Sequence, residues 1–172
     1  NPIEAINREL GEWALRFLLM ALAITPLRQL TRWNGFSRFR RLLGLWAFAY
    51  VSLHLSSYIV LDHFFNWSDI WSDIVKRTFI TVGMFTFVLL LSLAITSTKG
   101  WVRRLGRRWQ KLHRLVYLAS FAGVVHFYMM VKADTREPLI YVGVVIILLG
   151  WRVVTALLRR LRRAPSSHPQ KV

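Results

Sequence analysis

The sequence predicts an all-α protein, a polytopic bundle of five transmembrane helices. Hydrophobic residues make up 55% of the 172 positions, and the mean hydropathy is positive although lysine and arginine together number 24. The apolar residues gather in five stretches, and charged residues are concentrated in the gaps between them. Both features are unusual for a water-soluble domain and typical of a membrane protein.

The five apolar stretches approach the roughly 20 residues that a helix needs to cross a hydrocarbon core about 30 Å thick. The first and the fourth stretch are short, and the first contains Arg16. We therefore expect these two helices to include flanking residues whose long side chains extend to the membrane surface. In chain order the stretches cover residues 13–27, 42–61, 78–96, 115–131 and 139–158.

The gaps between the stretches differ in the sign of their charge. The first and third gaps and the C-terminal tail are rich in arginine and lysine, whereas all eight acidic residues lie in the N-terminal segment or in the second and fourth gaps. No acidic residue therefore falls inside a predicted span. By the positive-inside rule the basic gaps and the C-terminus are cytoplasmic, and the acidic gaps face outward. The N-terminus then lies outside, as expected if an earlier span precedes it.

Residues 1–163 are predicted to form one membrane domain. Residues 164–172 contain proline and serine, and we expect them to be a disordered cytoplasmic tail. The outer segment 62–73 places aromatic residues among acids, a composition that suits either anchoring at the membrane surface or docking of a partner protein.

Histidines are the candidate functional residues, since the chain has no cysteine for disulfides, thiolate metal sites or iron–sulfur clusters. His54 lies 12 residues past Leu42, roughly 18 Å from the cytoplasmic boundary. His126 lies 11 residues past Leu115, roughly 16 Å from the same side. Both helices run outward. The two imidazoles can therefore meet at one depth, slightly beyond the middle of the membrane.

Two neutral nitrogen ligands on facing helices suit bis-histidine heme better than zinc, which usually takes a third or fourth protein ligand. The competing interpretation is that each histidine only forms a hydrogen bond to another helix. Ligand function is open for His113, which lies about 20 Å closer to the cytoplasm than His126 and is turned roughly 140° from it on an ideal helix. His63 is interpreted as an interfacial residue, and His168 lies in the tail.

The arginine-rich gaps have two interpretations. They can set the topology and attract anionic lipid. Alternatively Arg40, Arg41 or Arg104 can pair with heme propionates or with a flavin phosphate at the cytoplasmic face, because guanidinium groups offer paired donors to such anions. Nucleic-acid binding is disfavoured, since no basic helix remains free of the membrane.

Several motifs carry a family resemblance. The chain resembles the MsrQ (YedZ) family of heme-binding membrane subunits, within the ferric reductase-like transmembrane superfamily that includes the NADPH oxidases. The similarity extends along the whole chain. The motifs are Ile-Thr-Pro-Leu at 24–27, Arg-Arg-Leu-Leu-Gly-Leu-Trp at 40–46, Leu-His-Leu-Ser-Ser-Tyr at 53–58, Leu-Gly-Arg-Arg-Trp-Gln-Lys-Leu-His-Arg-Leu-Val-Tyr at 105–117, Val-His-Phe at 125–127 and Pro-Leu-Ile-Tyr at 138–141.

The resemblance implies a bacterial inner-membrane protein that relays electrons and does not itself reduce methionine sulfoxide. Electrons would come from the quinone pool or a cytoplasmic flavin reductase and go to a periplasmic molybdenum-containing methionine sulfoxide reductase. It also implies b-type heme, an associated FMN and six spans, so that a first span would be missing here. Family ligand roles transfer to His54, His126 and, less directly, His113. The superfamily often has a second histidine at the inner level where this chain has Arg40.

Two other functions are compatible with the residues. One is a transmembrane ferric or cupric reductase, which needs the same hemes but no dedicated partner protein. The other is a small transporter whose histidines relay protons without heme, as intramembrane histidines sometimes do.

Overall fold

The computed structural model describes residues 2–131 and 134–162, and all regular secondary structure within these ranges is helical. The predicted all-α class is therefore confirmed for the described part of the chain. The helices are α1 (Pro2–Thr31), η1 (Asn34–Phe36), α2 (Ser37–Ser57), η2 (Tyr58–Asp62), α3 (Trp67–Lys76), α4 (Thr78–Ile95), α5 (Lys99–Leu105), α6 (Arg107–Leu112), α7 (Leu115–Met130) and α8 (Arg136–Leu161).

Each of the five predicted spans corresponds to a helix. Among the described residues, α1, α4, α8 and the segment 34–62, which includes α2, are long and apolar enough to cross a membrane. The fifth, α7, has 16 residues, which gives a length of about 24 Å, shorter than the hydrocarbon core. The predicted tail 164–172, including His168, lies outside the described residues.

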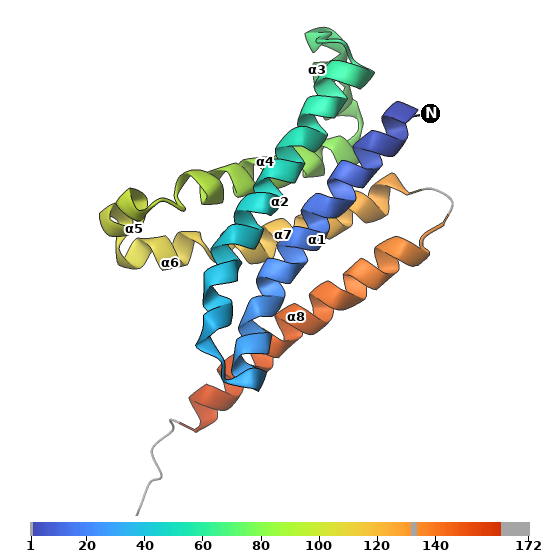
Figure 1. Cartoon of the computed structure of the whole chain (residues 1–172). Coiled ribbons are helices and arrows are strands. Elements are labelled where there is room, and N and C mark those ends of the chain that lie inside the picture. The colour runs from blue at the N-terminus through green and yellow to red at the C-terminus, as the bar shows by residue number, and fades with distance from the viewer. Residues whose placement is uncertain (1, 132–133, 163–172) are drawn as a thin grey trace, which may run out of the picture.

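Two antiparallel helix pairs form the body of the bundle (Figure 1). In the first pair α1 packs along α2, and in the second α4 packs along α7, while α8 lies against α1 and α7. Ala47 on α2 and Ala119 on α7 are completely buried. Small residues at such positions allow helix backbones in a membrane to approach closely.

The core consists of two clusters of apolar side chains that share α1 and α7. The first cluster joins α1, α7 and α8, and the second joins α1, α2, α4 and α7. The outer faces of the helices also carry many apolar side chains, as expected where the surroundings are lipid. The clusters contain Leu15, Leu19, Leu22, Val124, Phe127, Val145 and Leu148, and Leu18, Ala47, Leu90, Leu93 and Ala119, respectively.

Short helices connect the spans. At one end of the bundle, α2 continues into the π-helical turn η2, and Asn66 caps α3 by accepting a hydrogen bond from the Asp69 backbone N–H. At the other end, Gly106 separates α5 from α6 with a φ of 51°, a conformation that suits glycine because it has no Cβ. The segments η2 and α3 thus connect α2 to α4, and α5 and α6 connect α4 to α7.

Candidate functional site

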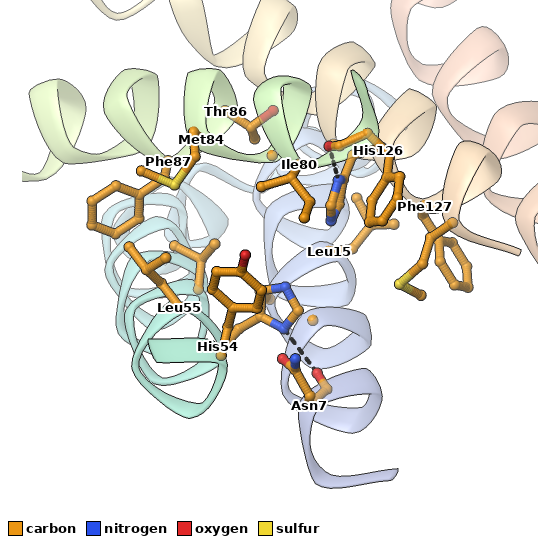
Figure 2. A pocket seen from close by; sticks show the side chains of 18 of the residues that line it. Asn7, Leu15, His54, Leu55, Ile80, Met84, Thr86, Phe87, His126 and Phe127 are labelled. Atoms are coloured by element: carbon orange, nitrogen blue, oxygen red, sulfur yellow. Dashed lines mark hydrogen bonds between the residues drawn. The ribbon is translucent and has the colours of Figure 1, made fainter. Parts of the chain in front are cut away.

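His54 on α2 and His126 on α7 project into the same cavity (Figure 2). Their ring centres are 6.2 Å apart and the ring planes are inclined by 77°. The cavity has a volume of about 280 Å³ and lies between α1, α2, α4 and α7. The structure thus brings together the two histidines that the sequence places at one membrane depth.

Each histidine is tied to the backbone of a helix other than its own. His54 Nδ1 lies 2.8 Å from the carbonyl oxygen of Asn7 on α1, and His126 Nδ1 lies 2.7 Å from the carbonyl oxygen of Phe79 on α4. A carbonyl oxygen can only accept, so Nδ1 carries the proton in both rings. In the neutral imidazole the lone pair is then on Nε2, the atom left free to bind a metal.

The two hydrogen bonds follow the same pattern in the sequence. In each case the carbonyl belongs to the residue 47 positions before the histidine. The helix pairs α1–α2 and α4–α7 therefore act as two copies of one unit, with a supporting helix and a ligand helix. The supporting helix orients the ring and fixes its tautomer, as second-shell partners of metal-binding histidines do.

The arrangement fits a metal held through both Nε2 atoms. With metal–nitrogen bonds of about 2 Å on either side, the ring centres would be about 6 Å apart, close to the separation found. Among the described residues no group of three or more histidine, cysteine, aspartate or glutamate side chains is placed to hold a metal. A pair of histidines without a third protein ligand would suit heme iron, which the porphyrin also binds.

The cavity lining is mostly apolar and includes a few charged side chains. Leu18, Val51 and Leu90 line it near one end, while Arg8 and Arg77 also belong to its lining. A mostly apolar lining with a few polar groups suits an amphiphilic planar cofactor.

Glu12 is a buried acidic residue that adjoins the predicted first span. It belongs to α1, which begins at Pro2, earlier than the predicted first span, and the glutamate is only 7% exposed. Its Oε1 accepts a hydrogen bond from Arg8 at 2.9 Å and its Oε2 accepts one from Arg16 at 2.7 Å. The burial of this charge is possible because both carboxylate oxygens are paired.

These arginines also attach α1 to α8. Arg8 forms a 2.6 Å ion pair with Glu137, and Arg16 donates a hydrogen bond to the Tyr141 hydroxyl at 2.9 Å. Arg16, which the sequence places within the first span, is thus part of this network.

His113 lies in a second cavity of about 770 Å³, at the helix ends next to α5 and α6. Its ring stacks on Trp109 with centres 3.9 Å apart, and its Nε2 lies 3.1 Å from the Thr96 hydroxyl. Burial lowers the pKa of His113, and the nearby Arg40 guanidinium acts in the same direction. The ring is therefore neutral at physiological pH, the form that can bind a metal.

The second cavity is strongly basic. Arg40 and Arg41 line it together with His113, as the sequence suggested, whereas Arg104 lies over the Trp101 ring and lines neither cavity. Arg152 of α8 also reaches this cavity, donating hydrogen bonds to the Tyr117 hydroxyl and to the Leu22 carbonyl. The other basic lining residues are Lys99, Arg103 and Arg114.

His63 lies outside both cavities. Its Nε2 is 3.4 Å from Asp73, and its ring packs edge-to-face against Tyr58. Near it, α3 exposes Trp67, Trp71 and Val75, which recur every four residues on one face. This exposed apolar face is compatible with the predicted position of His63 at the membrane surface.

Sequence reasoning missed the residues of the supporting helices. The carbonyls of Asn7 and Phe79 belong to the backbone, so no residue type in the sequence marks them. Glu12 was predicted to lie outside the first span. The one available signal was the spacing of glycines, since Gly11 and Gly83 each precede a histidine of the pair by 43 residues.

Comparisons with known proteins agree with this architecture. The family described as "Ferric reductase like transmembrane component" matches residues 10–124, a segment that contains His54 and ends two residues before His126. No solved structure matches significantly.

Three similar proteins carry the name "Protein-methionine-sulfoxide reductase heme-binding subunit MsrQ". The protein of Rhodospirillum rubrum is 60% identical over 168 residues, which cover 96% of this chain and 81% of the relative. That of Caulobacter vibrioides is 56% identical over 89% of this chain and 73% of the relative. That of Xanthomonas euvesicatoria is 51% identical over 98% of this chain and 78% of the relative. The chain therefore belongs to the MsrQ family, within the ferric reductase-like transmembrane proteins.

Proposed function

We propose that the chain is a transmembrane electron-transfer subunit of the bacterial inner membrane. In this proposal it uses b-type heme to pass electrons to a periplasmic molybdenum-containing methionine sulfoxide reductase. The donor is the quinone pool or a cytoplasmic flavin reductase. The relatives named as heme-binding subunits of a methionine sulfoxide reductase support the heme and the partner system.

The single observation that carries the proposal is the pair His54 and His126. Two rings from neighbouring helices face one cavity at 6.2 Å, and both have Nε2 free because a backbone carbonyl engages Nδ1. Heme bound there supplies one-electron chemistry through its iron. The chain has no cysteine, so a heme held by these residues would not be attached through thioether bonds.

A second heme or a flavin is assigned to the inner cavity. His113 is the candidate ligand there, and Arg40 and Arg41 are candidates to pair with propionates or with the phosphate of FMN. Arg104 is a candidate for the same anions only if its side chain leaves the Trp101 ring. The basic lining suits an anionic occupant at the face where the proposed donors deliver electrons.

The charge distribution supports the direction of transfer. Basic residues at the inner ends of the helices indicate the cytoplasmic side, and the His54–His126 pair lies in the outer half of the bundle. With the outside positive, moving an electron outward across the whole membrane releases up to about 2.3 kcal/mol per 100 mV.

Glu12 does not favour the alternative of a proton-relaying transporter. A carboxylate within a span would suit such a protein, yet both oxygens of Glu12 are held by Arg8 and Arg16. We interpret it as a structural ion pair.

The test is an absorption spectrum of the purified protein before and after dithionite, followed by reoxidation. We expect a heme spectrum that sharpens on reduction, and rapid reoxidation by the periplasmic reductase with methionine sulfoxide present. A colourless protein would contradict heme binding. Reoxidation by ferric chelates but not by the reductase would support a transmembrane metal reductase instead.

A further inference from the structure

Gly11 and Gly83 lie directly against the rings of the two candidate ligands. A Cβ at position 83 would be 2.8 Å from His126 Cε1 and 3.0 Å from its Nδ1. A Cβ at position 11 would be 3.1 Å from His54 Cε1 and 3.2 Å from its Nδ1. Carbon atoms in contact prefer about 3.5–4.0 Å. An alanine at either position would therefore push on the imidazole.

Each glycine works together with the carbonyl that binds the same ring. Gly11 follows Asn7 by four residues on α1, and Gly83 follows Phe79 by four residues on α4. Residues four apart lie on the same face of a helix, about one turn apart. The Cε1 and Nδ1 atoms of each ring thus lie close to the glycine, while Nδ1–H donates to the carbonyl one turn away.

We propose that Gly11 and Gly83 are positioning residues for the heme ligands. Their missing side chains let His54 and His126 lie deep enough to form both carbonyl hydrogen bonds and to direct Nε2 into the cavity. This inference rests on the proposed heme function and adds to it two glycines that line the same cavity as the histidines.

The close contact with a histidine ring is not shared by the glycines of α8. Gly143 and Gly150 on α8 have nothing within 4 Å of an added Cβ, so an alanine there meets open space. Replacing glycine by alanine inside a helix ordinarily stabilises the helix. A loss at positions 11 and 83 would therefore come from the ring contact and not from the helix itself.

The two contacts differ in tightness, and this difference gives a ranking. The Gly83 contact is under 3.0 Å at its closest and involves three ring atoms within 3.4 Å, whereas the closest approach at Gly11 is 3.1 Å. His126 should therefore be displaced further by Gly83→Ala than His54 by Gly11→Ala.

The experiment compares Gly83→Ala and Gly11→Ala with the matched controls Gly143→Ala and Gly150→Ala in the full chain. Heme content, the reduced absorption bands and the low-spin ferric signals in electron paramagnetic resonance are measured. We expect heme affinity to fall about 10-fold or more in Gly83→Ala, the range seen when second-shell support is lost. Gly11→Ala should show a smaller fall, both variants should have shifted ferric g-values, and the controls should match the wild type.

Retention of wild-type heme content and unchanged ferric g-values in Gly83→Ala would overturn the inference while leaving the proposed function intact. Absence of heme from the wild type would overturn both.

If Gly83→Ala folds poorly, a second substitution that removes the contacted ring shows whether that ring is the cause. In the double variant Gly83→Ala/His126→Gly the alanine has no imidazole to displace. Recovery of folded protein to the level of His126→Gly supports the inference, because the damage then depends on the ring. Equally poor folding of the double variant overturns it, because alanine would then disrupt the helix pair by another route.

Discussion

The imidazole rings of His126 and His54 lie in one cavity, with their centres 6.2 Å apart and their planes inclined by 77°. Neither ring is positioned by its own helix alone. The carbonyl of Phe79 on α4 holds one, and the carbonyl of Asn7 on α1 holds the other. The site is therefore formed by two helix pairs that each contribute one ligand and one supporting backbone.

His113→Ala is expected to lower the heme content without abolishing the signal from the outer pair. His113 lies in the inner cavity and does not line the one that contains His54 and His126. The measurement is heme per protein by pyridine hemochrome assay, together with the reduced spectrum. An unchanged heme content and spectrum would exclude His113 as a ligand.

Glu12→Gln is expected to destabilise the protein by about 1–3 kcal/mol, the cost of weakening charged hydrogen bonds at a buried group. Glu12 is buried and pairs with both Arg8 and Arg16, which in turn contact α8. The measurement is thermal unfolding in detergent at a fixed detergent concentration. Glu4→Gln is the control, since Glu4 is exposed in the first turn of the same helix. Equal stability of the two variants would show that the ion pairs do not hold α1 to α8.

The proposed topology can be tested with single cysteines, because the chain contains none. Ser68→Cys on α3 and Arg108→Cys on α6 are both at exposed positions. In intact spheroplasts a membrane-impermeant maleimide should label Ser68→Cys, and it should label Arg108→Cys only after permeabilisation. The reverse pattern would invert the proposed direction of electron transfer.

Much of the fold can be predicted from the sequence. The membrane determines the length of each apolar stretch and the distribution of arginine between the gaps, whatever the packing of the helices. The five predicted stretches correspond to α1, α2 with η2, α4, α7 and α8. Helix ends were less predictable. The first helix extends outward to include Glu12, since Arg8 and Arg16, one turn away on either side, compensate its charge.

The proximity of the two histidines was predictable from the sequence, but the carbonyls that bind them were not. The membrane depth of His54 and His126 can be estimated by counting residues along straight helices. This estimate needs no information on how the helices pack. The carbonyls of Asn7 and Phe79 come from helices whose pairing depends on packing. A backbone acceptor is chemically identical at every residue, so only the three-dimensional structure distinguishes these two.

In the proposed site, His54 and His126 together bind one heme iron. The measurement is electron paramagnetic resonance of the ferric protein in wild type, His54→Ala and His126→Ala, with His63→Ala as the control outside the cavity. We predict a low-spin bis-histidine signal in the wild type and in His63→Ala, and its loss in each of the other two variants. Persistence of that signal in either His54→Ala or His126→Ala would contradict the central claim.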